Sequence, residues 1–198
     1  MSGTLNLTGS LERLVADICS RLEEFSHIDT ERLLICLSTT RGGGIHGVYA
    51  KIHPLRFAGG ERSRQVRRGR RTFTCTMPVI EQRGTEMLYI IYFLVPRFFD
   101  LPLREKLITI IHELYHISPA FDGDIRRFPG RNFAHGSSTR SYNEAMGKIA
   151  DSWLSSLADD SILDFLRDDL ETLRSRHRML VGRKMRAPRI QLAAGQTQ

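Results

Sequence analysis

The sequence lacks the features that mark several classes of protein. Its 198 residues include only three cysteines, Cys19, Cys36 and Cys75, which lie far apart and form no CxxC pair. Each lies in an apolar stretch, so we expect buried, reduced thiols rather than a disulfide framework or a cysteine zinc site. No basic segment followed by an apolar run begins the chain, and the most hydrophobic stretch, 87–95, is less than half a membrane-spanning helix. We therefore expect a soluble, cytoplasmic protein that makes no contact with a membrane.

Acidic residues are in the minority, and the excess of positive charge is unevenly distributed. The formal net charge is +7. The first basic run, 61–71, has six arginines against the single acid Glu61. A second basic run, 174–189, contains no acid. The arginines of the first run are Arg62, Arg64, Arg67, Arg68, Arg70 and Arg71. Basic segments hold nucleic acid through phosphate contacts, so these arginines are candidate nucleic-acid contacts. The alternative is a solvated loop followed, at the C-terminal end, by a basic tail.

The composition is that of a globular chain, with 41% hydrophobic and 26% charged residues. The length suits one domain. We expect a single domain over residues 10–185, a disordered tail at 1–9, and a disordered basic and polar tail at 186–198. We find no internal repeat and no sign of a domain boundary.

Apolar periodicity predicts the main elements. Helices are predicted at 11–25, 100–117, 142–157 and 160–180, and strands at 33–40, 47–57, 72–80 and 87–95. Asp100 and Pro102 are expected to cap and begin the second helix, and Pro119 to end it. The arginine-rich segment is expected to be a loop. A second loop, 119–141, is long for a simple connection and is a candidate functional loop.

The second predicted helix carries the sequence His112-Glu113-Leu114-Tyr115-His116, an H-E-x-x-H motif. Positions four apart lie one above the other on a helix, so both imidazoles can reach one metal ion. A zinc ion lowers the pKa of its bound water toward neutrality, and Glu113 is placed to take the proton. At 100° per residue, the apolar positions of this helix form a stripe about 80° wide, opposite the histidines. We therefore expect the helix to pack on a sheet with its histidines facing a cleft. The alternative is two histidines on an exposed polar face.

A catalytic zinc ion usually has three protein ligands and one open position, and spacing gives three candidates for the third. His135 is favoured, because imidazole is a better zinc ligand than a lone carboxylate and Gly136 allows close backbone approach. Asp122 has the spacing of the H-E-x-x-H-x-x-G-x-x-(H/D) class, but that class needs glycine where this chain has Pro119. Glu144, near the start of the next predicted helix, is the other alternative. Tyr142 is a candidate to stabilise an oxyanion during hydrolysis.

These motifs, together with the strand at 87–95, the segment Phe121-Asp-Gly-Asp124 and residues 131–136, resemble small zincin-like metallopeptidases. The nearest resemblance is to the phage metallopeptidase family, with the SprT-like proteases more distant. It covers residues 87–150, and the cysteine-rich zinc ribbon of the SprT-like proteins is missing. The resemblance implies an α+β zincin-like fold in which a small mixed sheet packs on the active-site helix between flanking helices. It also implies His112, His116 and His135 as zinc ligands and Glu113 as general base.

Motif and resemblance together favour a zinc-dependent metallopeptidase that hydrolyses peptide bonds of a protein or peptide in the cytoplasm. The competing hypothesis is a nucleic-acid-binding protein with a structural or vestigial zinc site, or a DNA-associated protease that combines both. A hydrolase with a non-peptide substrate is a third reading of the same chemistry, and the sequence does not predict the oligomeric state.

Overall fold

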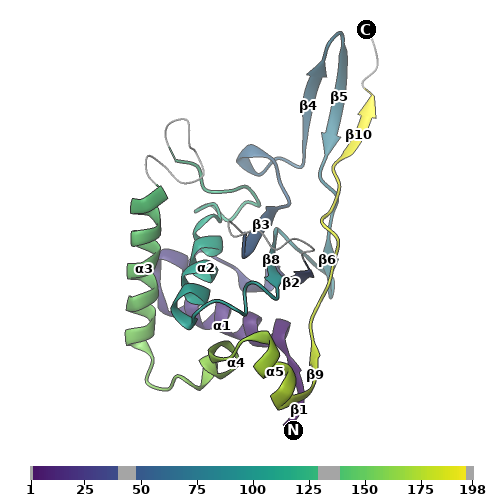
Figure 1. Cartoon of the computed structure of the whole chain (residues 1–198). Coiled ribbons are helices and arrows are strands. Elements are labelled where there is room, and N and C mark those ends of the chain that lie inside the picture. Colours follow the sequence, from purple (N-terminus) through teal and green to yellow (C-terminus); the bar gives the residue numbers. More distant parts are fainter. Residues whose placement is uncertain (1, 40–47, 129–138, 195–198) are drawn as a thin grey trace.

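The structure, a computed structural model, describes residues 2–39, 48–128 and 139–194 (Figure 1). Its strands are β1 (Ser2–Asn6), β2 (Leu33–Thr39), β3 (Ala50–Pro54), β4 (Ser63–Arg68), β5 (Arg71–Thr76), β6 (Glu81–Gln82), β7 (Thr85–Glu86), β8 (Tyr89–Val95), β9 (His177–Val181) and β10 (Gln191–Ala194). Its helices are α1 (Leu7–Arg21), α2 (Leu103–Tyr115), α3 (Thr139–Ser156), α4 (Asp164–Arg167) and α5 (Leu170–Arg176), with short 3-10 turns η1 (Glu23–Phe25), η2 (Thr30–Arg32), η3 (Ala58–Gly60) and η4 (Ser161–Leu163). The fold is α+β with small sheets, as the sequence predicted.

The central sheet has the strand order β2-β8-β3, with β2 parallel and β3 antiparallel to β8. Strand β8 lies in the middle, and its first six residues are buried on both faces. Alternate residues therefore enter two separate apolar clusters. Ile91 and Phe93 join the larger cluster on the helical side, whereas Ile90 and Tyr92 join a smaller one on the other side. This two-sided burial explains the unbroken apolar run in the sequence.

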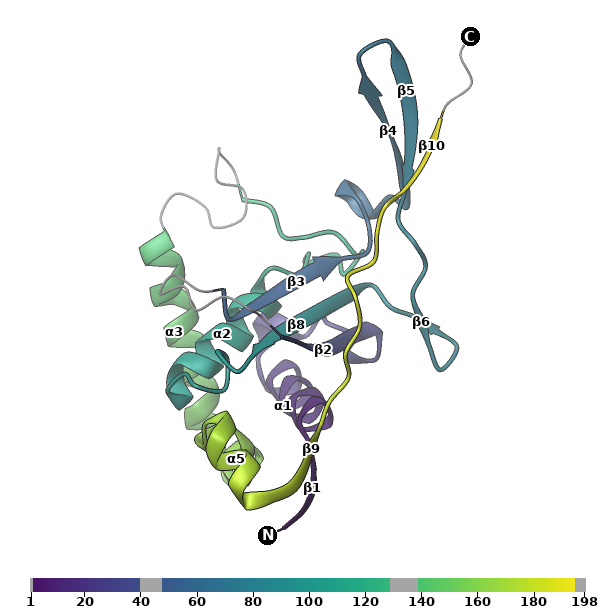
Figure 2. The same ribbon diagram turned by 45° about the vertical axis from the view of Figure 1, so that its right-hand side comes forward.

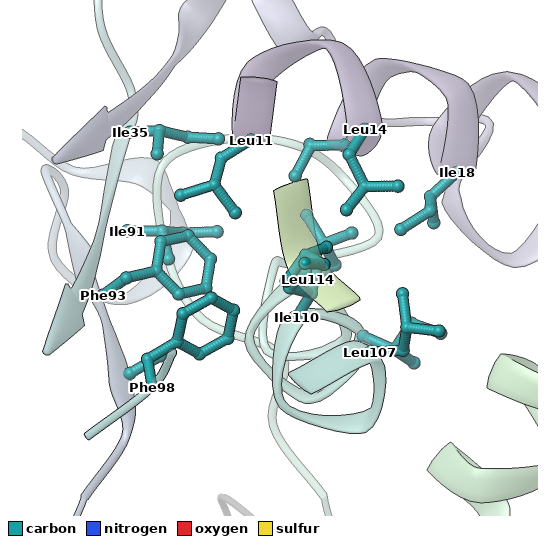
Figure 3. Close-up of a cluster of buried hydrophobic side chains, with 14 of the residues drawn as sticks. Leu11, Leu14, Ile18, Ile35, Ile91, Phe93, Phe98, Leu107, Ile110 and Leu114 are labelled. Atoms are coloured by element: carbon teal, nitrogen blue, oxygen red, sulfur yellow. The ribbon is translucent and has the colours of Figure 1, made fainter. Parts of the chain in front are cut away.

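Helices α1 and α2 cover one face of this sheet (Figure 3). The two helices and the sheet meet in a cluster of fully buried side chains. It includes Leu11 and Leu14 of α1, Ile110 and Leu114 of α2, and Ile91 of β8. The expected apolar stripe of α2 is thus the face that packs into the core. Pro102 is itself the N-cap of α2, and it makes no side-chain capping hydrogen bond, so the predicted cap by Asp100 is wrong.

The helix predicted over 160–180 is interrupted. The chain forms α4 and α5 instead, with an extended Asp168 between them, and continues as strand β9. Lys106 of α2 explains how the interruption is stabilised. Its buried ammonium donates hydrogen bonds to the carbonyls of Leu166, at 2.7 Å, and Asp168, at 2.8 Å. These carbonyls would otherwise be unsatisfied where α4 ends.

The segment predicted as an arginine-rich loop forms β4 and the turn of a β-hairpin instead, and the strand predicted at 72–80 contains most of its second strand, β5. Strands β4 and β5 pair antiparallel, and Gly69, with φ of 60°, allows the tight turn between them. Strand β10 pairs with the other side of β5 and completes a three-stranded sheet, here called the arm. Figures 1 and 2 both show the arm projecting away from the rest of the molecule.

Both terminal segments contain strands where we expected disordered tails. Strand β1 pairs in parallel with β9, although most of the chain lies between them in sequence. Strand β10 lies within the predicted tail 186–198. Residues 182–190 run as an extended strap from β9 to the arm (Figure 2). The strap is fixed to the body because the backbone N–H of Leu37 donates to the carbonyl of Arg183 at 2.7 Å. Close approach at this point requires Gly182, where a Cβ atom would lie 2.4 Å from the Leu37 side chain.

Among the residues that the structure describes, no helix has both the length and the apolar character needed to cross a membrane.

Candidate metal centre

The H-E-x-x-H motif lies in the last turns of α2 and at its C-terminal end. Because Ile110, Leu114 and Ile117 are fully buried in the core, the helix is fixed in rotation about its axis. Beyond the helix the chain turns back, and the backbone N–H of Arg126 donates to the His116 carbonyl at 2.7 Å. The Arg126 guanidinium also donates to the Tyr115 carbonyl at 2.8 Å. The end of α2, and with it His116, is therefore held by the following segment.

The two motif histidines are arranged as a pair of metal ligands would be. Their Nε2 atoms lie 3.0 Å apart, and their rings meet at an interplanar angle of 78°. Two nitrogens that each lie 2.0–2.1 Å from one tetrahedral zinc ion are separated by about 3.3 Å. His112 is half-buried and His116 is buried, so one of the two remains accessible from solvent. This pair fits one zinc ion after a movement of a few tenths of an ångström.

Glu113 lies between the histidines in sequence but faces the sheet edge. Its side chain is 7% exposed, and the backbone N–H of Ile52, in strand β3, donates a hydrogen bond to its carboxylate. Burial raises the pKa of Glu113 to about 7, and the Ile52 hydrogen bond opposes that rise. A carboxyl group with a pKa near neutrality can both accept and return a proton, as a general base must.

A cavity of about 950 Å³ opens beside the motif. It lies between α2, α3 and the chain entering β3, and it includes His112 and Glu113 in its wall. The other lining residues are Val48, Tyr49, Ala50, Arg104, Glu105, Ile108, Thr109, Asn143, Glu144, Gly147, Lys148 and Asp151. The cavity therefore reaches His112, whereas the buried His116 is not among its lining residues, and its wall is mixed in polarity.

Tyr142 of α3 packs directly against the histidine pair. Its ring centroid lies 5.0 Å from that of His112, edge to face, and 5.9 Å from that of His116, nearly parallel. The Tyr142 side chain is buried, and burial raises the pKa of its phenol. The Tyr142 ring, which belongs to the buried core, thus restricts the movement of both imidazoles. The oxyanion role that we expected for Tyr142 stays a prediction, and the structure shows its ring in contact with both imidazole rings.

The three candidates for a third ligand are not equally placed. His135 lies outside the described residues. The carboxylate of Asp122 accepts a hydrogen bond from the backbone N–H of Asp124 at 3.1 Å, within a turn that packs against η3. Glu144 is exposed and lines the same cavity as His112. Across residues 2–39, 48–128 and 139–194, no three His, Cys, Asp or Glu side chains come together as a metal site.

Asp124 has a structural role in the same turn. Its carboxylate pairs with Arg127 at 2.8 Å and accepts from the backbone N–H of Gly59 at 3.2 Å. Its carbonyl accepts from the buried hydroxyl of Tyr89 at 2.8 Å. The segment therefore joins η3 to the sheet beneath the end of α2.

Two features of the site had no signal in the sequence. The contact between Glu113 and Ile52 depends on which strand lies beside α2. The sequence of β3 does not indicate which helix packs beside it. Arg104 and Asp151, which pair across the cavity wall at 2.8 Å, belong to different helices far apart in the sequence. Exposed arginines and aspartates are common on protein surfaces, so the residue types alone do not predict that these two form a pair.

Comparison with protein families gives an independent result. The family model described as "Putative phage metallopeptidase" matches residues 8–135, about two thirds of the chain, and the match includes the motif. The chain belongs to this family. The match also extends the resemblance seen in the sequence to α1, to β2 and β3 of the central sheet and to the arm's hairpin, which precede residue 87. Searches of curated proteins and of solved structures found no match.

Proposed function

We propose that this member of the phage metallopeptidase family is a zinc-dependent peptidase with a zincin-like active site. The observation that carries the proposal is the His112–His116 pair, with Nε2 atoms 3.0 Å apart, beside a buried Glu113 and an open cavity. An exposed pair of helical histidines would need neither the buried carboxylate nor the cavity.

His112 and His116 would hold the ion, and we propose His135 as the third ligand, with Asp122 and Glu144 as alternatives. A zinc ion at this position supplies a lowered water pKa and polarisation of the scissile carbonyl. Glu113 accepts the proton of the attacking water and returns it to the leaving amine, because its raised pKa suits both transfers. Tyr142 keeps the two imidazoles in place.

Strand β3 offers a place for a peptide substrate. Tyr49 bonds to Leu94 of β8 and Leu55 bonds to Leu88 just before β8, so the backbone groups of the even-numbered residues of β3 face away from the sheet. The Ile52 N–H is occupied by Glu113, which leaves Val48 and Ala50 beside the cavity. An extended peptide that pairs with these two residues would pass the site as an added strand.

The test begins with zinc analysis of protein purified without chelators, together with a screen of peptide substrates. We expect one zinc per chain. Glu113→Gln is expected to keep the zinc and to lower hydrolysis by about 10²–10⁴-fold, the usual contribution of a general base. His112→Ala and His116→Ala are expected to lose the zinc.

His53→Ala serves as the matched control, because His53 lies on β3 but not in the cavity wall, and it is expected to keep both properties. Comparison of His135→Ala, Asp122→Asn and Glu144→Gln for zinc affinity identifies the third ligand. Wild-type protein without zinc, or a Glu113→Gln variant as active as wild type, would contradict the proposal.

A further inference from the structure

The arm carries a concentration of positive charge that the proposed peptidase site does not use. Residues 62–76 contain six arginines and no acid, and the adjoining strap adds Arg186 and Arg189. Every one of these arginines is exposed. Figures 1 and 2 show the arm standing clear of the body in both views, so its charge faces solvent.

Only the base of the arm uses its arginines for the fold. Arg62 pairs with Glu86 at 2.9 Å, and the Arg64 guanidinium lies 4.9 Å from the centre of the Phe57 ring. The other four, Arg67, Arg68, Arg70 and Arg71, surround the turn at the tip. In the described part of the chain, none of these four arginines forms an ion pair with a carboxylate.

These tip arginines do not stabilise the arm. Arg68 and Arg71 are direct cross-strand partners, and like charges that face each other across strands are destabilising. Among the described residues, the side chain of Arg67 makes a local hydrogen bond alone, from its Nε to the Gly69 carbonyl at 3.1 Å. A repulsive cluster that contributes nothing to packing is best explained by an anionic partner.

The shape of the tip favours a duplex as that partner. Strand β10 pairs with residues 73–76 of β5, and among the described residues the arm beyond them is a two-stranded ribbon. Six residues of β4, at about 3.3 Å each, give the hairpin a length of roughly 20 Å. The major groove of B-DNA is about 12 Å wide and admits a two-stranded β-ribbon.

The composition of the tip disfavours other anionic surfaces. Residues 67–72 contain no apolar side chain that could enter a membrane. Phe73, half-buried, is the arm's single aromatic residue, so the arm has no series of rings on which the bases of a single strand could stack.

We propose that the tip of the arm binds double-stranded DNA, with Arg67, Arg68, Arg70 and Arg71 contacting phosphates along a groove. Arginine suits this role because its planar guanidinium donates two parallel hydrogen bonds to a phosphate. The inference does not depend on peptidase activity, and the arm can bind DNA whether or not the zinc site is catalytic.

The experiment measures binding of the full-length protein to a fluorescently labelled DNA duplex of mixed sequence, by anisotropy, from 50 to 200 mM salt. Four phosphate contacts give a slope of log K against log salt of about −3.6, so affinity is expected to fall about 100-fold or more over this range. The variant Arg67→Gln/Arg68→Gln/Arg70→Gln/Arg71→Gln is expected to bind at least tenfold more weakly at 50 mM and to lose most of that slope.

The matched control removes four exposed positive charges elsewhere: Arg83→Gln/Arg174→Gln/Arg178→Gln/Lys184→Gln. It is expected to keep wild-type affinity to within about threefold. Circular dichroism and zinc content, measured for both variants, are expected to match wild type, which shows that the body remains folded.

Four results would overturn the proposal. They are the absence of salt-dependent binding by wild type at 50 mM, an equal loss in both variants, tighter binding to single strands than to the duplex, and competition by polyglutamate or anionic vesicles at the same charge concentration as the duplex.

Discussion

Replacement of Lys106 by methionine is expected to destabilise the protein, because Lys106 joins α2 to the break between α4 and α5. Its side chain is 1% exposed, and its Nζ donates to two carbonyls at 2.7 and 2.8 Å. Methionine has nearly the same length and fills the same space without a donor. The substitution therefore tests the hydrogen bonds rather than the packing.

The magnitude follows from two opposing effects. Each hydrogen bond from a charged donor contributes about 1.5–3 kcal/mol, so their loss costs about 3–6 kcal/mol. Removal of the ammonium relieves part of this cost, since its burial is unfavourable, as the lowered pKa of Lys106 indicates. We expect a net loss of about 2–4 kcal/mol in the free energy of unfolding, or about 4–16 °C in melting temperature for a chain of this size.

Urea unfolding followed by circular dichroism measures the change, with Lys184→Met as the control. Lys184 is an exposed lysine of the strap, and its replacement is expected to shift the unfolding free energy by less than about 0.5 kcal/mol. A Lys106→Met protein as stable as wild type, or more stable, would refute the reasoning. It would show that burial of the ammonium costs as much as its two hydrogen bonds contribute.

Three further predictions concern other parts of the molecule. A hydrogen bond from Arg56, together with the charges of neighbouring arginines, lowers the pKa of Glu86 below its ordinary value of 4.5. The stabilisation by Glu86 is therefore present above pH 4.5 and is lost as pH falls through the lowered value; Glu86→Gln is expected to flatten this part of the pH–stability curve in thermal melts. Tyr142→Ala is expected to weaken zinc binding about tenfold in chelator competition, whereas Tyr142→Phe, which keeps the ring, stays within about threefold of wild type. Equal zinc affinity of the alanine variant would remove Tyr142 from the positioning of the histidines. Gly182→Ala is expected to cost about 1–3 kcal/mol in urea unfolding, because the new Cβ would meet Leu37 at 2.4 Å. An unchanged midpoint would mean that the strap does not hold its place against β2.

The sequence predicted the parts of the fold whose signal is local. The apolar run at 87–95 predicted β8, and the spacing of Leu107, Ile110 and Leu114 predicted both α2 and its buried face. Since the phase of a helix also fixes its opposite side, the sequence placed the motif histidines beside a cleft, and the structure shows a cavity at His112 but not at His116. Glu113 could be assigned a role, but its burial against β3 could not be foreseen.

Elements that depend on distant partners were missed. Strands β1 and β9 pair across nearly the whole chain, and neither has an apolar pattern strong enough to mark it alone. Strand β4 was hidden by its arginines, since Val66 is its single apolar residue, whereas most of β5 lies within the strand predicted at 72–80. The break after α4 is stabilised by Lys106 of α2, and the sequence around the break gives no indication of this distant contact.

The two outer edges of the central sheet are treated differently, and this bears on aggregation. At β2, the strap bonds to Leu37, and the Arg183 guanidinium donates to the Ile35 carbonyl at 3.0 Å. These backbone groups of β2 are therefore not available to pair with the strand of another molecule. The β3 edge is covered by no strand in the described residues, and a fully open edge invites pairing between copies of a protein. The carboxylate of Glu113 takes the Ile52 N–H from the middle of that edge. The residue proposed for catalysis thus also shortens the stretch on which a second copy could build a continuous sheet.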